Sequence, residues 1–397
     1  MIRRPPRSTQ GVSSAASDVY KRQVCTHTGE VKDEQFGGSV SPIFVSTSYE
    51  YIDKDISRYP RYFNTPNQEM LSNKIAKLES CESAMIFASG MAVISTTLLA
   101  FLNKGDHIVL QNDIYGGTRN LVEDQFKRYG IEFTFTRGLT IQDFEREIKH
   151  NTKIIYIESP SNPLLKIVDI NAISNLAKIN NIISVIDNTF ATPILQKPTL
   201  LGVDIILHSA TKYFGGHSDI SAGAVASSQK NIDIIWSLAK NLGGNLSDYS
   251  VWLLERSMKT MGLRVAKQQK NAMKLAKYLY NSNFTNKVFY PGLKSHENHL
   301  LAKKQMKGFG AMISFEFKES IDTIKFLKSL KLIKPSMSLA GVESTMLSPA
   351  ATSHHLLSQT DRNTQGITDE LIRFSVGIEN KKDIIKDIEQ AIGCSIK

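Results

Sequence analysis

A carboxylate and a lysine lie one strand–helix unit apart, each directly after an apolar run of β-forming residues. The run IISVID ends in Asp187, and the run VDIILHS continues into ATKYFGGHSD, which contains Lys212. Pyridoxal 5'-phosphate requires such a pair, because a carboxylate must keep its pyridine nitrogen protonated and a lysine must form an imine with its aldehyde. The hydroxyls of Ser209 and Thr211 are placed to hold the phosphate. The prediction rests on this combination, since one lysine among 48 basic residues means little.

The elements that must position these groups follow from an alternation of short apolar runs with helical stretches. Such an alternation predicts a mostly parallel sheet covered by helices on both faces. Ligands of these sheets bind beyond the carboxyl ends of the strands. The predicted strands are AMIFA (84–88), HIVLQ (107–111), IEFTFT (131–136), KIIYIES (153–159), IISVID (182–187), VDIILHS (203–209) and AGAVAS (222–227).

The second half of the chain predicts a smaller unit. Residues 251–283 form one long, basic helical pattern, whose lysines and Arg264 we expect to be solvated. Beyond Pro291-Gly292, the patterns at 310–317, 321–330 and 371–377 indicate an α+β domain.

The segment HSATKYFGGHSD resembles the lysine signature of the Cys/Met-metabolism family of pyridoxal-phosphate enzymes. The resemblance extends from His27 to Gly377 and implies an α/β, fold-type I transferase architecture, with a mostly parallel central sheet covered by helices and a smaller α+β C-terminal domain. It implies an N-terminal arm (24–60), a large cofactor-binding domain (61–250) and a C-terminal domain (251–397). It also implies a homotetramer built as a dimer of dimers.

Two segments are suited to the cofactor's phosphate. SRYPRYFN resembles the family's phosphate clamp, which implies that Tyr59 and Arg61 bind the phosphate of the neighbouring subunit. An arginine suits this role because its fork donates two hydrogen bonds. Gly90 and Met91 follow a strand and open a helix, and amides at a helix N-terminus bind anions.

Further blocks imply contacts with the cofactor ring and the substrate. In NDIYGGTRN, the resemblance makes Tyr115 the residue that stacks on the ring and can transfer protons. Asn162 in ESPSNP would lie near the phenolic oxygen and the substrate. The resemblance implies that Arg373 takes the substrate carboxylate with help from Ser338. We also expect Ser353 to contact the substrate, and we expect no metal.

The resemblance implies a lyase that cleaves carbon–sulfur bonds of cystathionine, homocysteine or methionine by α,γ- or α,β-elimination in trans-sulfuration. The alternative is a γ-replacement enzyme, either a cystathionine γ-synthase or an O-acylhomoserine sulfhydrylase. A non-catalytic binding scaffold is a remote alternative, since the catalytic residues are in place. Methionine γ-lyases carry Cys two residues after the stacking tyrosine, where this chain has Gly117. We expect glycine to leave room for a bulky substrate arm, which favours cystathionine or homocysteine over methionine.

Composition excludes several other classes. No apolar run approaches the roughly 18 residues of a membrane helix, and three scattered cysteines argue against disulfides or zinc. The net charge of +10 is too dispersed to indicate nucleic acid binding. Nucleotide-binding glycine motifs are absent. We therefore expect a cytoplasmic enzyme with a small-molecule amino-acid substrate and neither a nucleic acid nor a membrane partner.

Residues 1–23 differ from the rest in being rich in Arg, Ser and Pro without an apolar pattern. An organellar transit peptide, a disordered basic arm and translated read-through of a sequencing adapter are all compatible with this composition. We favour the last, so we expect a non-native or disordered leader whose removal leaves activity and stability nearly unchanged.

Overall fold

The computed structural model describes residues 22–352, 362 and 366–397. The first 21 residues of the predicted leader lie outside this part of the chain. The last two, Arg22 and Gln23, lie in a helical segment that continues to residue 27. Val24 and Cys25 in this segment are buried. Arg22 and Gln23 are exposed, so the first buried residue of the described chain is Val24, where the predicted arm begins.

A seven-stranded sheet forms the larger half of the molecule, in the order β1-β7-β6-β5-β4-β2-β3. All the predicted strands are present. Strand β7 is antiparallel to both β1 and β6, whereas the neighbours from β6 to β3 are parallel. The strands are β1 (Ser83–Phe87), β2 (His107–Leu110), β3 (Glu132–Phe135), β4 (Thr152–Glu158), β5 (Ile183–Asp187), β6 (Ile205–His208) and β7 (Gly223–Ser227).

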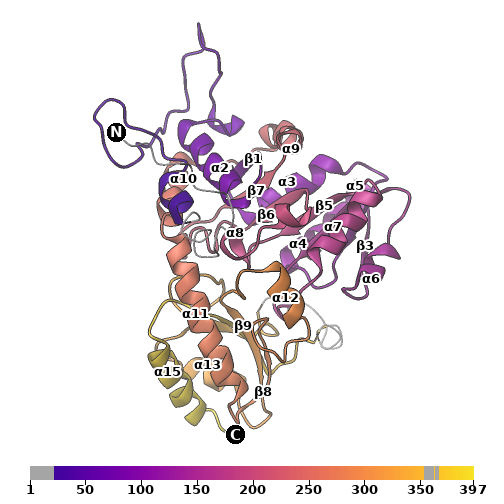
Figure 1. The fold of residues 1–397 in the computed structure, drawn as a ribbon, viewed down its shortest axis with the longest axis vertical. Helices are drawn as coiled ribbons and strands as arrows, with labels where there is room; N and C mark the ends of the chain where they lie inside the picture. The colour runs from indigo at the N-terminus through magenta and orange to yellow at the C-terminus, as the bar shows by residue number, and fades with distance from the viewer. Residues whose placement is uncertain (1–21, 353–361, 363–365) are drawn as a thin grey trace, which may run out of the picture.

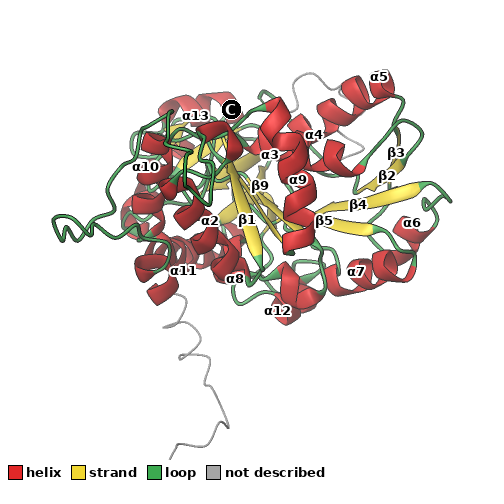
Figure 2. Ribbon diagram, turned by 90° about the horizontal axis from the view of Figure 1, so that it is seen from above, coloured by secondary structure: helices red, strands yellow, loops and turns green. Residues whose placement is uncertain are grey.

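Helices cover both faces of this sheet (Figure 2). Alternate residues of β4 point to opposite faces, as the pleat of a strand requires. Tyr156 packs in one core cluster with residues of α3 and α9, whereas Ile155 packs in another with residues of α7. The helices of this half are η1 (Pro60–Tyr62), α2 (Pro66–Glu79), α3 (Gly90–Phe101), α4 (Gly116–Asn120), η2 (Leu121–Phe126), α5 (Lys127–Tyr129), α6 (Ile141–Glu145), α7 (Ile170–Ile179), α8 (Thr192–Leu195), η3 (Pro198–Leu201) and α9 (Gln229–Leu242).

A five-stranded sheet in the order β10-β11-β12-β9-β8 forms the smaller half, in the lower part of Figure 1. Strand β12 lies between β11 and β9 and is antiparallel to both. The helices and strands of this smaller half are β8 (Thr285–Phe289), α12 (His299–Gln305), β9 (Met312–Phe317), α13 (Thr323–Ser329), β10 (Lys334–Pro335), β11 (Thr345–Leu347), β12 (Leu371–Ser375) and α15 (Lys381–Gly393).

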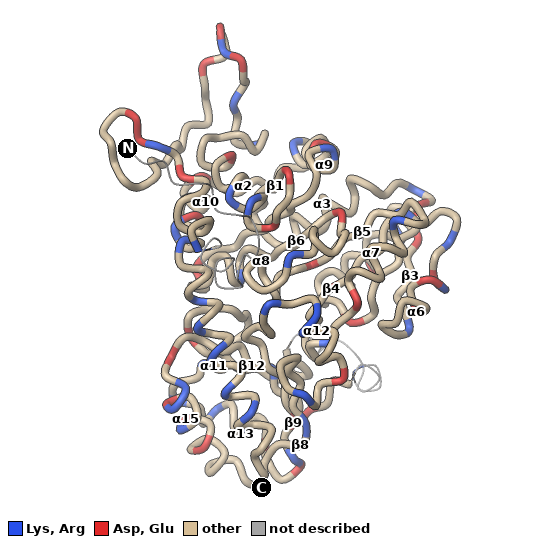
Figure 3. Tube along the Cα trace, viewed as in Figure 1, with Lys and Arg blue, Asp and Glu red and all other residues tan. Residues whose placement is uncertain are grey.

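The long basic stretch is two helices, α10 (Asp248–Met258) and α11 (Met261–Tyr280). Helix α11 runs from the larger half down along the smaller sheet (Figure 1). Lysines line it as predicted (Figure 3). The prediction was wrong for Arg264, which is buried and donates to the carbonyl oxygens of Tyr213 and Phe214 at 2.9 and 3.3 Å. Helix α11 thus holds the segment that follows Lys212.

An N-terminal arm leads from residue 28 to η1 without a helix or strand. It projects from the larger half at the top of Figure 1. Its exposed large apolar side chains are Phe36, Val40, Phe44, Val45, Tyr51, Ile52 and Ile56. In the described part of the chain, no helix is long and apolar enough to cross a membrane.

Candidate active site

Asp187 ends β5 at the carboxyl edge of the large sheet and is buried. Its Oδ1 accepts a hydrogen bond from the Thr189 amide at 2.9 Å. Burial raises the pKa of Asp187, while hydrogen bonds from Thr189 and the nearby His208 oppose that rise. A buried carboxylate of this kind favours a cationic partner over water, because an unpaired charge is costly there.

Lys212 lies in the turn after β6, where its amide donates to the Ser209 carbonyl at 3.1 Å. Its Nζ donates to Ser338 Oγ at 3.1 Å. Burial and the positive charge of Arg373 both lower the pKa of Lys212. The lysine therefore gives up its proton more readily than a solvated lysine, as an imine-forming or proton-accepting amine must.

Arg373 lies on β12 and is buried. Its Nη1 donates to Asn162 Oδ1 at 3.1 Å, and its Nη2 donates to the Ser338 carbonyl at 3.0 Å. Burial lowers the pKa of Arg373 to about 10, so it stays cationic at neutral pH. Four predicted residues, Lys212, Arg373, Asn162 and Ser338, therefore meet although they come from both halves of the molecule.

Ser338 joins the lysine to the arginine because its hydroxyl faces one and its carbonyl the other. Its backbone is in the left-handed region, with φ of 77°. A non-glycine residue is uncommon there. The adjoining pocket, of about 520 Å³, is lined by Thr211 and Ser338 and by Glu343, whose carboxylate pairs with Lys334 at 3.0 Å. The segment at Ser338 thus borders both this pocket and the Lys212 amine.

Tyr115 precedes α4, and its side chain is 44% exposed. Its amide donates to Glu158 Oε2 at 2.8 Å. A Cβ at Gly117 would lie 2.5 Å from Tyr115 Cε1 and 3.0 Å from Met91 Sδ. Our reason for expecting space for a substrate arm at Gly117 was therefore wrong, because the Tyr115 ring fills that space. The expected substrate preference stays a prediction.

The N-terminus of α3 faces the same edge. Ser89 caps it and accepts from the Ala92 amide at 3.0 Å. The amides of Gly90 and Met91 precede the first intrahelical donors, so they are free to bind an anion. Ser209 adjoins them, since a Cβ on Gly90 would lie 3.0 Å from Ser209 Oγ.

The Thr211 hydroxyl makes two hydrogen bonds to the backbone of Ala222. It donates to the Ala222 carbonyl at 3.1 Å and accepts from the Ala222 amide at 2.9 Å. Both bonds fix the entry to β7. A phosphate contact by Thr211 stays a prediction. The hydroxyl could make it through its second lone pair, or after losing one of its bonds to Ala222.

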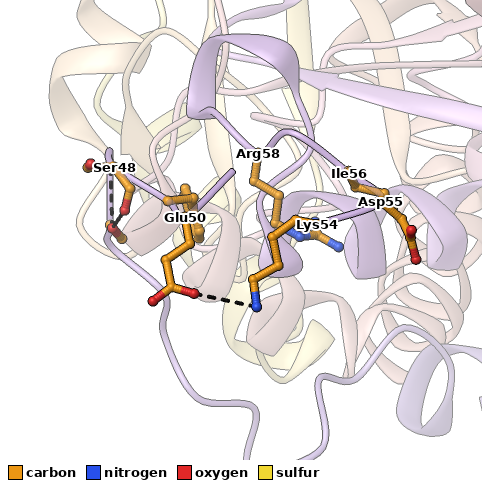
Figure 4. Close-up of a pocket in the computed structure, with 8 residues that line it drawn as sticks. Ser48, Glu50, Lys54, Asp55, Ile56 and Arg58 are labelled. Atoms are coloured by element: carbon orange, nitrogen blue, oxygen red, sulfur yellow. Dashed lines mark hydrogen bonds and ion pairs between the residues drawn. The ribbon is translucent and has the colours of Figure 1, made fainter. Parts of the chain in front are cut away.

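Tyr59 and Arg61 lie on the outer surface of the large half. Arg61 donates to the Lys240 carbonyl on α9, and its guanidinium carbon is 5.5 Å from the ring centres of Tyr59 and Tyr62. Both predicted clamp residues are exposed, so neither is part of this subunit's core. A neighbouring pocket of about 540 Å³ (Figure 4) is lined by eight residues between Ser46 and Arg58. Ser353 lies outside the described residues.

Two buried carboxylates near Asp187 were not predicted. Glu158 ends β4 and pairs in register with Asp187 on β5. Glu79 ends α2 and accepts from His208 and from the Asn188 side chain. The Glu158 side chain could have been suspected from the end of the run KIIYIES. No local pattern marks Glu79, since His208 lies 129 residues away along the chain.

Residues 22–393 match the family described as Cys/Met metabolism PLP-dependent enzyme. The chain belongs to this family. The enzyme is 40% identical over 377 residues to the cystathionine γ-lyase of Bacillus subtilis strain 168. The match covers 94% of this chain and 99% of that protein. It is 43% identical over 338 residues to an L-methionine γ-lyase of Fusobacterium nucleatum subsp. polymorphum, covering 84% of this chain and 85% of that protein.

The solved structures agree. The crystal structure of a cystathionine γ-lyase from Lactobacillus plantarum, complexed with L-serine, superposes with a TM-score of 0.91 and 38% identity. The match covers 94% of this chain and 98% of that one. The predicted fold-type I class is therefore confirmed, with its mostly parallel sheet and smaller second sheet.

Pyridoxal phosphate is the cofactor of the family and hence of this enzyme. The site suits it. Asp187 offers a buried carboxylate for the pyridine nitrogen, Lys212 a desolvated amine for the aldehyde, and the α3 N-terminus free amides for the phosphate. These three groups follow β5, β6 and β1, neighbouring regions of one sheet edge. The predicted cofactor is confirmed.

Proposed function

We propose that the enzyme is a carbon–sulfur lyase that acts on cystathionine or homocysteine in trans-sulfuration. The observation that carries the proposal is the meeting of Lys212 Nζ and the Arg373 guanidinium at Ser338. A cation for a carboxylate then lies beside an amine that can move a proton. That arrangement suits an α-amino acid whose Cα–H bond must break. The names of the relatives support carbon–sulfur cleavage as the outcome.

Arg373 would receive the α-carboxylate of the substrate in a bidentate pair. Its bonds to Asn162 and to the Ser338 carbonyl orient the guanidinium before the substrate arrives. Preorganisation of this kind lowers the cost of binding. With the carboxylate held there, the substrate Cα would lie toward Lys212.

Lys212 would remove the proton from Cα, because its lowered pKa makes the neutral amine available. Bound pyridoxal phosphate would supply the electron sink for the negative charge that develops at Cα. Loss of a β-substituent needs only this proton transfer. Loss of a γ-substituent needs a second one at Cβ, for which Lys212 and Tyr115 are the candidates. With one water molecule consumed to release the amino group, the products would be a thiol, ammonia and a 2-oxo acid.

The enzyme would act as a cytoplasmic homotetramer built from two tight dimers. The exposed apolar side chains of the arm support burial against a second subunit. Tyr59 and Arg61 would then bind the phosphate held by the neighbouring subunit. In the described part of the chain, their recorded side-chain contacts are with Lys240 on α9, with each other and with Tyr62, and none is with the Lys212 segment.

The test is product analysis with purified enzyme on cystathionine, homocysteine, methionine and O-acylated homoserine. We expect thiol, ammonia and a 2-oxo acid, with higher kcat/KM for cystathionine or homocysteine than for methionine. Arg373→Lys should raise KM for every amino acid, since it loses the fork. If only O-acylated homoserine plus a thiol reacted, giving a thioether without a 2-oxo acid, the enzyme would be a γ-replacement enzyme instead.

A further inference from the structure

We propose that Glu158 is a positioning residue that holds Tyr115 and Asn162 against the bound cofactor. The inference concerns cofactor geometry and holds whichever sulfur amino acid the enzyme cleaves. It begins with location. Glu158 is the last residue of β4 and lies directly opposite Asp187 in the parallel pairing of β4 with β5. Its side chain is 5% exposed, so it needs partners within the protein.

Those partners are the two loops that carry predicted ring and substrate contacts. Glu158 Oε2 accepts the Tyr115 amide at 2.8 Å, in the loop after β2. The backbone amide of Asn162, in the loop after β4, also faces this carboxylate and favours its charged form. A single side chain therefore fixes the start of the Tyr115 loop and lies against the start of the Asn162 loop. A buried backbone amide left without its acceptor is costly, so this bond constrains the loop that carries Tyr115.

The backbone of Glu158 is itself fixed by Gln111, at the end of β2. Gln111 Nε2 donates to the Glu158 carbonyl at 3.0 Å, and Gln111 Oε1 accepts from the Glu158 amide at 3.1 Å. Gln111 also donates to Asp113 Oδ1 at 3.0 Å, and Asp113 accepts from Ser161 Oγ at 2.7 Å. The loops after β2 and β4 are thus joined on both sides of Glu158.

The connection continues to the substrate end of the site. Asn162 Oδ1 accepts from Arg373 Nη1. A displaced Asn162 would therefore release one of the bonds that orient the guanidinium. Burial, followed by the charge of Asp187, raises the pKa of Glu158 well above its ordinary value, against the two amides that favour the carboxylate. Keeping this group beside Asp187 is costly, which argues for a role beyond filling space.

The experiment compares Glu158→Gln with Asp387→Asn. The matched control replaces a carboxylate, 5% exposed, that accepts the amides of Lys331, Leu332 and Ile333 far from Lys212. Both changes keep the size and replace one carboxyl oxygen, an acceptor, with an amide NH2 group that can only donate. Pyridoxal phosphate is titrated into each cofactor-free variant to obtain Kd, and the visible circular dichroism of the bound cofactor reports how its ring is held. Tm and the kcat and KM for cystathionine complete the comparison.

We expect Glu158→Gln to weaken cofactor binding about tenfold, to diminish the visible circular dichroism and to lower kcat about a hundredfold, because a displacement of about 1 Å has that effect. Asp387→Asn should lower Tm by a similar amount and leave Kd and the dichroism unchanged. If Glu158→Gln proves unstable, Glu158→Asp should show intermediate losses in the same quantities.

The proposal is overturned if the variant that folds loses Tm alone and keeps the wild-type Kd and dichroism. Since neither of these two measurements involves a substrate, they stand even if the enzyme turns out to catalyse replacement.

Discussion

Replacing Gly117 with alanine tests whether the Tyr115 ring needs the space that the missing side chain at position 117 leaves. The new Cβ would lie 2.5 Å from Tyr115 Cε1 and 3.2 Å from Cδ1. Carbon atoms pack best at about 3.5–4.0 Å, so the ring must retreat by about 1 Å. Such a displacement of a group in contact with the reacting centre costs up to about a hundredfold in rate, or about 2.7 kcal/mol.

Stability should change little. Tyr115 is 44% exposed, so its ring can move without opening the core. Alanine is also favoured over glycine within a helix such as α4 by about 0.5–1 kcal/mol. We therefore expect a nearly unchanged Tm and a kcat/KM that falls about thirty- to a hundredfold for cystathionine and homocysteine.

The assay is steady-state release of 2-oxo acid, measured with Tm on the same preparations. Gly393→Ala is the control, because no atom lies within 4 Å of a Cβ at that position in α15. It should leave both quantities unchanged. An unchanged kcat/KM for Gly117→Ala would refute the reasoning. If Gly117→Cys lost activity on cystathionine but gained it on methionine, the predicted preference for cystathionine would be supported, although not by space for the substrate arm.

Four further predictions follow from the site. Borohydride reduction of the purified enzyme should attach the cofactor to Lys212, and a peptide map that finds it on another lysine would exclude this residue. The pKa of Lys212 is lowered in the folded state, so between that pKa and the ordinary 10.5 the unfolded state binds more protons. The cofactor-free protein should therefore gain stability as pH rises through this range. A plot of Tm against pH should show this rise, and Lys212→Met should flatten it. Arg61→Ala should weaken cofactor binding about tenfold through loss of a charge-assisted pair, and an unchanged Kd in the assembled enzyme would contradict the shared phosphate site. Deletion of residues 1–21 should leave kcat unchanged and Tm within about 1 °C, as expected for a polar, unpatterned terminus; a large drop in Tm would make the leader part of the fold.

The sequence predicted the large sheet well because its strands are short apolar runs with clear breaks between them. It also predicted where Asp187 and Lys212 lie, since groups that follow neighbouring parallel strands meet at one edge. Arg373 and Asn162 came from resemblance, and the structure brings them within 3.1 Å of each other. The roles proposed for these residues still await experiment.

What escaped prediction depends on contacts between distant segments. Arg264 occupies a position in a basic helical pattern, yet its acceptors are carbonyls some 50 residues away along the chain. Periodicity reports which face of a helix is polar but not what covers that face. Gly117 is a different case, because the side chain that fills its space, Tyr115, is only two residues away. The direction in which that ring points depends on the local backbone, which the residue types alone do not specify.

Helix α11 has a consequence for the construction of chimaeras between relatives. Near its start it holds the Lys212 segment through Arg264, and further along Gln268 donates to the Gly341 carbonyl at 2.8 Å and Asn271 to the Gly377 carbonyl at 3.1 Å. A recombination point at Pro291, where the chain pattern breaks, would therefore pair one parent's α11 with the other parent's Gly341 and Gly377 loops. A crossover before Met261 keeps the helix with the small sheet, and the Arg264 contacts are then among those that must be matched. Exchanged substrate specificity should survive the second junction better than the first.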